Sequence, residues 1–212
     1  MNELKYTLIA DGSSDKTLLR IIKWLLDDLY PKLPNAGSFA DFRLITDPPK
    51  KLSDKVAMAR YYFPYDVLFV HRDSESIRAG AISKRIKEIK KEIGEEQFQQ
   101  TICIIPVKMM ETWLLIDAEA IRKAAGNRNY RGAINLPPLK KLEKENQPKN
   151  VLHTLLQNAS GLKGRNLKKF NIDKAVHLVA ENTGDFSPLR SLPAFQAFEK
   201  NMTEVMKNYS GE

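Results

Sequence analysis

Cysteine is almost absent from this chain, since Cys103 is the only one among 212 residues. A disulfide framework and a cysteine-rich zinc site each need at least two cysteines, so the sequence excludes both. Histidine is scarce as well, because His71, His153 and His177 are the only three, and none is paired at metal-ligand spacing. We expect Cys103 to be a buried core thiol. His71, at the end of an apolar run, could orient a water or a substrate, but a structural role is favoured.

Long apolar runs are missing too. A helix that spans a bilayer needs about 20 consecutive apolar residues, and no run in the sequence approaches that length. The apolar part of residues 1–12 is too short and wrongly flanked for a secretory signal. We therefore expect a cytoplasmic protein that has no membrane partner.

Two common nucleotide-binding loops are absent. The sequence contains neither the GxxxxGK[ST] phosphate loop nor the GxGxxG dinucleotide fingerprint. A P-loop NTPase and a dinucleotide-dependent dehydrogenase are therefore both excluded as interpretations.

What the chain does contain is a regular alternation of short apolar runs and amphipathic stretches. The apolar runs predict strands at residues 4–10, 42–46, 67–71 and 101–107. Helical spacing of apolar residues predicts helices at residues 18–29, 53–62, 77–98 and 111–125, and later at 150–158, 172–181 and 193–208. This order predicts an α/β fold with a doubly wound, mostly parallel sheet in residues 1–125. Residues 126–212 would form a mainly helical extension packed on that sheet.

The positive charge is concentrated in that extension. Residues 1–119 carry 18 Lys and Arg against 18 Asp and Glu, whereas residues 120–212 carry 16 against 8. The second region therefore supplies the whole net charge of +8. This asymmetry favours a basic region that meets a polyanion, although a solvated helical surface rich in lysine explains it equally well.

Acidic residues follow three of the predicted strands. Asp11 and Asp15 come after the first, Asp73 and Glu75 after the third, and Glu111 after the fourth. Because functional residues of a doubly wound sheet collect beyond the carboxyl ends of its strands, we expect these acids to lie together. Packed carboxylates repel one another unless a cation intervenes, and their oxygens suit Mg²⁺ or Mn²⁺. Each acid also has a simpler explanation as a first-turn residue that favours the helix dipole.

The pair after the third strand carries most of this expectation. Asp73 and Glu75 are two residues apart, so both carboxylates would point the same way if the segment were extended. Arg72 and Arg78 beside them could hold a transferring phosphate, or could hold Asp73 in place.

A second group of candidates is basic. The segment after Gly161 concentrates positive side chains that could contact the phosphates of a nucleic acid. The alternative is a solvated turn. The four residues are Lys163, Arg165, Lys168 and Lys169.

The order strand–Asp11-Gly12-x-x-Asp15–helix, followed by strand–Asp73-x-Glu75, is similar to the Toprim domain of topoisomerases, primases and the nucleases of the overcoming-lysogenization-defect family. Residues 106–117 (PVKMMETWLLID) and 189–198 (LRSLPAFQAF) resemble a family of uncharacterised bacterial Toprim-like proteins. That family is associated with phage defence, and its members often sit beside genes for ABC/SMC-type ATPases.

The resemblance implies cleavage of nucleic acid, DNA or RNA, that depends on Mg²⁺ or Mn²⁺. Asp11 would stand in the place of the glutamate that acts as general acid or base, and Arg72 and Glu111 would join it in catalysis. The metal would be held by Asp15, Asp73, Glu75 and Glu111. Two positions depart from the Toprim pattern, because Asp11 replaces a Glu and Glu75 replaces the second Asp of Asp-x-Asp.

Three functions therefore stay open from the sequence. The first is a Toprim-like nuclease that works as the effector of an anti-phage system, with an ATPase as partner. The second is an inactive subunit of the same fold that binds and regulates such an ATPase. The third is a metal-dependent enzyme on free nucleotides, and self-association into a homo-oligomer is open in every case.

Overall fold

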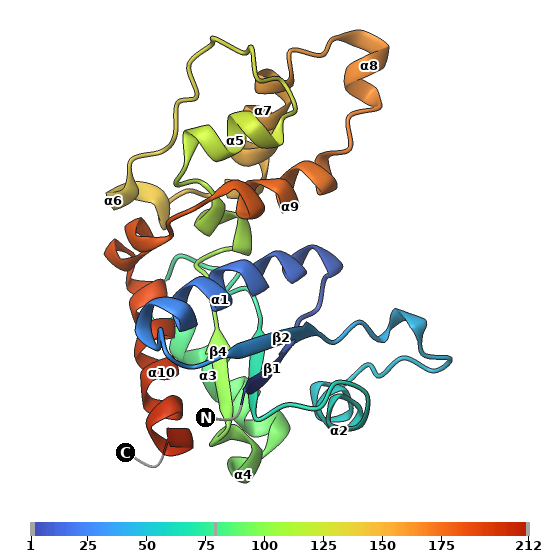
Figure 1. Cartoon of the computed structure of the whole chain (residues 1–212), viewed down its shortest axis with the longest axis vertical. Helices are drawn as coiled ribbons and strands as arrows, with labels where there is room; N and C mark the ends of the chain where they lie inside the picture. Colours follow the sequence, from blue (N-terminus) through green and yellow to red (C-terminus); the bar gives the residue numbers. More distant parts are fainter. Residues whose placement is uncertain (1–2, 79, 211–212) are drawn as a thin grey trace.

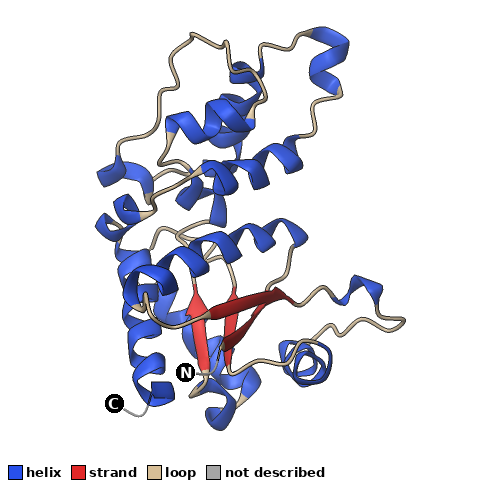
Figure 2. Cartoon of the chain, in the orientation of Figure 1, coloured by secondary structure: helices blue, strands red, loops and turns tan. Residues whose placement is uncertain are grey.

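The structure, a computed structural model, describes residues 3–78 and 80–210. Its centre is one four-stranded parallel sheet with strand order β2-β1-β3-β4 (Figure 2). The strands are β1 (Leu4–Ile9), β2 (Asn35–Phe39), β3 (Val67–His71) and β4 (Thr101–Ile104). The chain leaves β1 in one direction to form β2 and in the other to form β3 and β4. The crevice between the carboxyl ends of β1 and β3 is therefore the topological switch point, where sheets of this type bind ligands.

Helices cover both faces of the sheet, as the apolar strand β3 requires. Val67 and Phe69 belong to one hydrophobic core, whereas Leu68 and Val70 belong to the other. A strand buried on both faces needs an apolar layer on each side, which explains why its sequence is continuously hydrophobic. The predicted doubly wound α/β fold is confirmed.

Helices pack on both cores beside the sheet. On the first face lie α1 (Leu18–Leu29) and α10 (Pro193–Ser210), and on the second lie α2 (Leu52–Tyr62) and α3 (Ala81–Ile93). The helix predicted over residues 77–98 is shorter than expected, because Gly94 ends α3 and separates it from α4 (Glu95–Phe98). Gly94 has φ +84°, a conformation that favours glycine.

The predicted second strand, residues 42–46, is wrong. The strand is β2 (Asn35–Phe39), and Phe42–Leu44 forms the 3₁₀ turn η2. β2 is an edge strand whose side chains are largely exposed, so it has no apolar pattern to reveal it. Its Gly37 lies against the ring of Tyr6, which a Cβ would approach to 2.3 Å.

The C-terminal part forms a helical lobe and then returns to the sheet (Figure 1). The lobe is built from α5 (Ala118–Ala124), α6 (Leu139–Leu142), α7 (Pro148–Ser160), α8 (Gly164–Lys168) and α9 (Ile172–Asn182). Helices α5, α7 and α9 pack on one another, and α10 then runs along β4. Buried residues of the lobe, such as Leu156 and Val179, belong to the same core as Phe69 of the sheet.

The helix predicted over residues 111–125 is divided in two. Its first part is the 3₁₀ segment η3 (Met110–Leu114), and α5 follows after Asp117, whose side chain caps it. The predicted helices at 150–158, 172–181 and 193–208 correspond to α7, α9 and α10. Within the described ranges, no helix has the length and apolar character that crossing a membrane requires.

Candidate functional site

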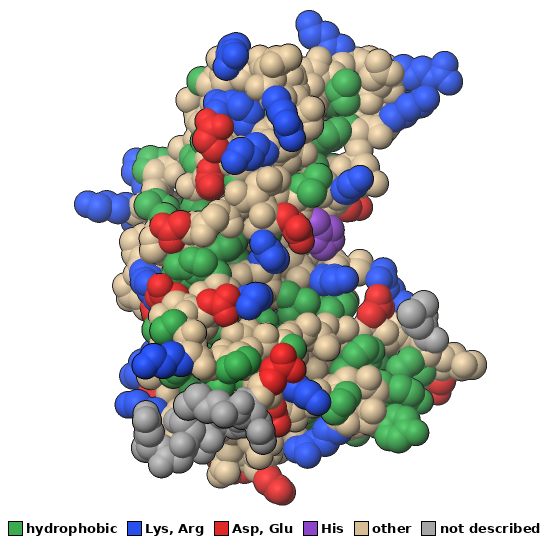
Figure 3. All heavy atoms as spheres, in the orientation of Figure 1, with side chains coloured by type: hydrophobic (Ala, Val, Ile, Leu, Met, Phe, Trp, Pro, Cys, Tyr) green, Lys and Arg blue, Asp and Glu red, His purple; other side chains and the backbone are tan. Residues whose placement is uncertain are grey.

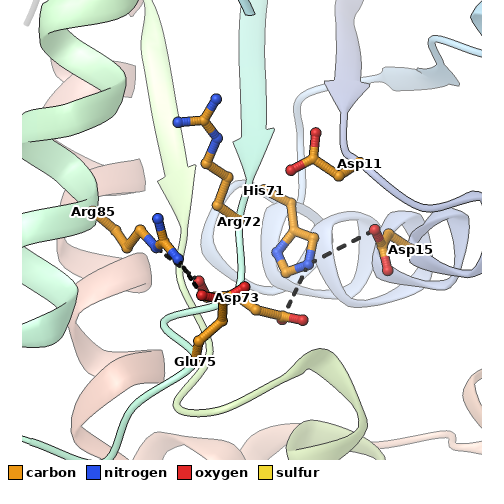
Figure 4. A pocket seen from close by; sticks show the side chains of 7 residues that line it. All are labelled: Asp11, Asp15, His71, Arg72, Asp73, Glu75 and Arg85. Carbon is orange, nitrogen blue, oxygen red and sulfur yellow. Dashed lines mark hydrogen bonds and ion pairs between the residues drawn. The ribbon is translucent and has the colours of Figure 1, made fainter. Parts of the chain in front are cut away.

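A pocket of about 290 Å³ opens at the switch point between β1 and β3 (Figure 4). Its walls come from the last residue of β3 and the segments that follow β1 and β3, together with one residue of α3. The lining residues are Asp11, Asp15, His71, Arg72, Asp73, Glu75 and Arg85. Four of the five predicted acids therefore line one pocket, and the fifth, Glu111, is close enough to interact electrostatically with Asp15 and Asp73.

His71 lies between two of the acids. Its Nε2 atom is 3.4 Å from Oδ1 of Asp73 and 4.0 Å from Oδ2 of Asp15 (Figure 4). Its Nδ1 atom is 3.0 Å from the carbonyl oxygen of Ile104 on β4. Burial by itself would lower the pKa of His71, but its interaction with Asp73 and the charge of Asp15 outweigh burial and raise the pKa.

Asp15 is placed by the short 3₁₀ segment η1 (Ser13–Thr17) that precedes α1. The backbone N–H of Gly12 donates to Oδ2 of Asp15 over 2.9 Å. This contact is the helix-start role that the sequence allowed, and it also fixes the carboxylate beside His71. Two residues later, Oγ1 of Thr17 lies 2.6 Å from Nδ1 of His177, which connects η1 to α9 of the helical lobe.

Asp73 carries an oxygen that lacks a well-formed hydrogen bond. Its Oδ1 is buried and makes no hydrogen bond within the described structure, and its ion-pair contact is with Nε2 of His71 at 3.4 Å. A buried oxygen in this state costs about 1–3 kcal/mol, so it calls for an explanation, such as a bound ion or water.

Glu75 points elsewhere. It has φ +54°, the left-handed conformation, so the segment is not extended and the expected alternation with Asp73 fails. Its carboxylate lies 2.7 Å from Nη2 of Arg85 and its side chain is 76% exposed. The two acids after β3 therefore engage different partners (Figure 4).

Arg85 organises this loop, although no sequence motif marked it as a site residue. Its Nε donates to the backbone carbonyl of Asp73 over 3.0 Å, and its Nη1 donates to Glu88 over 2.9 Å. An arginine inside an amphipathic helix gives no signal of such a role, because the loop reaches it only in the folded chain. Arg72, which was singled out, forms a two-pronged ion pair with Glu92, with N···O distances of 2.6 and 2.9 Å.

Asp11 lies at the rim of the pocket. Its side chain is 72% exposed and accepts a hydrogen bond from Nζ of Lys55 on α2 over 2.8 Å. Partial burial would raise the pKa of Asp11, but the Lys55 ammonium and the nearby Arg72 lower it below its ordinary value. Asp11 is therefore ionised and already paired, and Lys55 is another partner that the sequence did not reveal.

Glu111 is the most deeply buried of the five acids. It lies in η3, is 6% exposed, and has Nζ of Lys149 on α7 at 3.7 Å from its Oε1. Burial and the negative charges of Asp73 and Asp15 raise the pKa of Glu111, although Lys149 opposes the shift. The helical lobe thus supplies a cation to the acids at the sheet edge.

Apart from Arg72, the predicted basic residues lie away from the pocket or at its margin. All four residues of the cluster after Gly161 are exposed on α8 or beside it, at the outer end of the lobe (Figure 1). Lys and Arg side chains gather there, and the surface is hollowed between that end and the sheet (Figure 3). Arg78 is exposed and lines a second hollow of about 470 Å³, which shares Glu75 and Arg85 with the first.

A divalent cation fits the donor chemistry of the acidic pocket. The described residues include no group of three or more His, Cys, Asp or Glu side chains that could hold a metal as it stands. Asp73 nevertheless offers a buried oxygen without a hydrogen bond, and Asp15 and Glu111 add negative charge beside it. Hard oxygen donors of this kind are what Mg²⁺ and Mn²⁺ bind.

No family model, curated protein or solved structure matches this chain. The chemistry of the pocket and the fold around it are therefore the basis for a functional conclusion.

Proposed function

We propose that this chain is a Toprim-like, metal-dependent phosphodiesterase that cleaves nucleic acid. The observation that carries the proposal is the acid cluster of Asp15, Asp73 and Glu111 beside the switch point of a parallel sheet, in which Oδ1 of Asp73 is buried without a well-formed hydrogen bond. Structural capping explains Asp15, but it gives no reason for an unsatisfied carboxylate oxygen next to two other acids. The role as effector of an anti-phage system, with an ABC/SMC-type ATPase as partner, is proposed from the sequence resemblance alone.

Asp15, Asp73 and Glu111 would hold the ion, Mg²⁺ or Mn²⁺. Once bound, the ion would supply an activated water and would stabilise negative charge on the phosphate. Glu75 would act at the rim, because its carboxylate is held by Arg85. A ligand role for Glu75 would require that ion pair to open.

Asp11 would accept or return a proton at the mouth of the pocket. Its lowered pKa keeps it ionised near neutral pH, and its exposure lets a substrate reach it. Arg72 is committed to Glu92, so its contribution would be to orient the loop after β3. Arg78 is exposed at the adjoining hollow, which makes it the better placed of the two for a substrate phosphate.

The basic end of the helical lobe would bind the rest of a polymeric substrate. Lys163, Arg165, Lys168 and Lys169 are exposed together on one projecting segment. Phosphate contacts from such a segment strengthen binding without reading sequence, and they weaken steeply as salt rises. Binding of a free nucleotide in the pocket would not need these phosphate contacts.

The test is cleavage of defined substrates by the full chain. Purified protein is incubated with single- and double-stranded DNA, RNA and tRNA in the presence of Mg²⁺ or Mn²⁺. Each reaction is run with and without an ABC/SMC-type ATPase encoded by a neighbouring gene. We expect chain cleavage by the wild type, loss of at least about 100-fold in Asp73→Asn, and little change in Asp54→Asn, an exposed first-turn acid of α2 outside the pocket. Cleavage that persists in Asp73→Asn would refute the proposal.

One observation favours the inactive regulatory subunit as a second candidate. Both positions that depart from the Toprim pattern, Asp11 and Glu75, are exposed and held in ion pairs, with Lys55 and Arg85. A regulatory subunit would bind the ATPase with unchanged affinity in Asp73→Asn and would cleave no substrate in any combination. Pull-down and cleavage assays on the same two proteins distinguish these outcomes.

A further inference from the structure

We infer that His71 supplies an imidazole nitrogen to the metal site beside Asp15 and Asp73, and that the site therefore selects Mn²⁺ over Mg²⁺. The inference rests on the metal dependence in the proposed function, but not on cleavage. It assigns to His71 a role beyond the structural one expected from the sequence.

The first step is the tautomer of the imidazole. Nδ1 of His71 lies 3.0 Å from the carbonyl oxygen of Ile104, the residue paired with it across β3 and β4. A carbonyl oxygen only accepts, so Nδ1 carries the proton. In the neutral ring Nε2 then has a free lone pair. A histidine that donates its other nitrogen to a backbone carbonyl is the usual arrangement of a metal ligand.

The second step is the direction of Nε2. The side chain of His71 is 2% exposed, yet the ring lines the pocket, and Nε2 is the atom that approaches both Asp73 and Asp15 (Figure 4). Among the described residues, His71 is the only histidine of that lining. The ring is therefore fixed by the sheet at one nitrogen and presented to the acids at the other.

The third step is distance. Neighbouring ligands on one ion, each about 2.1 Å from it, lie about 3.0–3.5 Å apart. Nε2 of His71 is 3.4 Å from Oδ1 of Asp73, which is already within that range. Oδ2 of Asp15 is 4.0 Å from Nε2, so a shift of about half an ångström brings it into range.

The remaining explanation for the contacts among His71, Asp15 and Asp73 is an ion pair, in which protonated His71 neutralises the two carboxylates. That arrangement leaves Oδ1 of Asp73 without a well-formed hydrogen bond although a ring N–H would lie 3.4 Å away. A metal satisfies the same oxygen directly, and it replaces the proton on Nε2. The two explanations predict different spectra for the metal-loaded protein.

The nitrogen decides which ion is preferred. Mg²⁺ takes oxygen ligands almost exclusively and keeps several waters, whereas first-row transition ions bind imidazole well. Two carboxylates with one imidazole therefore favour Mn²⁺ over Mg²⁺ more strongly than carboxylates alone do.

The test measures metal binding on the full chain after removal of metals. Loss of the free Mn²⁺ signal in electron paramagnetic resonance counts bound Mn²⁺, and displacement by Mg²⁺ gives the ratio of the two affinities. Pulsed measurements on bound Mn²⁺ detect coupling to a ¹⁴N nucleus. His71→Gln is the test variant, because its amide oxygen offers an oxygen donor in the place of Nε2, and His153→Gln on α7 is the matched control.

We expect one Mn²⁺ per chain with ¹⁴N coupling in the wild type and in His153→Gln. In His71→Gln we expect the coupling to vanish and the preference for Mn²⁺ over Mg²⁺ to fall about tenfold. Bound Mn²⁺ without ¹⁴N coupling, an unchanged preference in His71→Gln, or no binding of Mn²⁺ at all would overturn the inference. If His71→Gln fails to fold, the wild-type spectrum alone decides.

The outcome is separable from that of the proposed function. Nitrogen-bound Mn²⁺ in a protein that cleaves nothing would sustain the inference and refute the nuclease. Conversely, the protein could cleave nucleic acid in a manner that depends on Asp73, while its bound Mn²⁺ shows no ¹⁴N coupling. That result would support the nuclease and refute the inference.

Discussion

The five acids of the sheet edge divide into two groups with different surroundings. The inner acids, Asp15, Asp73 and Glu111, have side chains 14%, 34% and 7% exposed. The outer acids, Asp11 and Glu75, are 72% and 76% exposed, and each has a cation within 2.8 Å, from Lys55 and Arg85. Within the described structure, the inner acids have His71, at 3.4 Å from Asp73 and 4.0 Å from Asp15, and Lys149, at 3.7 Å from Glu111, as their cationic partners. The comparison teaches that proximity in the fold does not make acids equivalent, since the outer acids are each paired closely with a lysine or arginine, whereas the inner acids make longer contacts with His71 and Lys149.

The largest expected difference is in Mn²⁺ affinity, between a variant that lacks an inner acid and a variant that lacks an outer acid of the same loop. In Asp73→Asn the affinity for Mn²⁺ should fall by at least about 100-fold, because a ligand is lost, whereas in Glu75→Gln it should fall less than about tenfold. Titration calorimetry with Mn²⁺ on both variants measures this. Equal losses in the two variants would abolish the distinction between inner and outer acids.

The next effect separates metal binding from polymer binding. Replacing Lys163, Arg165, Lys168 and Lys169 together by Ala should weaken binding of a fluorescent single-stranded DNA at least tenfold and lower its salt slope by up to about four. Affinity for Mn²⁺ should not change, because α8 contributes nothing to the pocket.

A control with the same change of charge uses exposed lysines away from α8. These are Lys32, Lys50, Lys51 and Lys87. Fluorescence anisotropy at several salt concentrations compares the two sets. An equal loss in both would mean that net charge, and not the position of α8, governs binding.

A moderate effect concerns stability and pH. Burial and neighbouring acids raise the pKa of Glu111, so the folded chain holds this proton at pH values where the unfolded chain has lost it. Stability therefore falls as pH rises from the ordinary glutamate pKa of about 4.5 through the raised value. Glu111→Gln removes this loss, so metal-free protein should gain on the order of 1 kcal/mol at pH 7.

The gain in Glu111→Gln should disappear at pH values below the ordinary pKa of glutamate, where both states are protonated. Saturating Mn²⁺ should stabilise the wild type more than the variant, since the ion replaces the proton. Urea unfolding at several pH values, with and without Mn²⁺, tests both statements. A variant that is less stable than the metal-free wild type at pH 7 would contradict them.

The smallest effect is expected at the rim. Lys55→Met removes the cation from the exposed Asp11, so stability should change by no more than about 0.5 kcal/mol. The affinity for Mn²⁺ should rise by less than about threefold, because one nearby positive charge is lost. Thermal unfolding and Mn²⁺ titration give both numbers, and a large change in either would place Asp11 with the inner acids.

Much of the fold followed from local pattern. The buried strands β1, β3 and β4 are marked by continuous apolar runs, and α1, α7, α9 and α10 by helical spacing, so the sequence predicted them. The edge strand β2 was not predicted, because its pairing with β1 depends on backbone hydrogen bonds that any side chain permits. The break at Gly94 was missed, although the apolar spacing ends at Ile93 and residues 94–97 (GEEQ) are not apolar.

The sequence by itself determined the parallel sheet and brought Asp11, Asp15, Asp73, Glu75 and Glu111 to one edge, since parallel strands end together. Only the tertiary structure decided which of them are neutralised. Lys55, Arg85 and Lys149 come from α2, α3 and α7, and their distances to the acids depend on how helices pack, not on spacing along the chain. The left-handed backbone at Glu75 and the carbonyl of Ile104 behind His71 are likewise set by contacts between β3 and its neighbours. An ion pair needs its two charges within about 4 Å of each other, so a sequence can gather charges at an edge but cannot pair them.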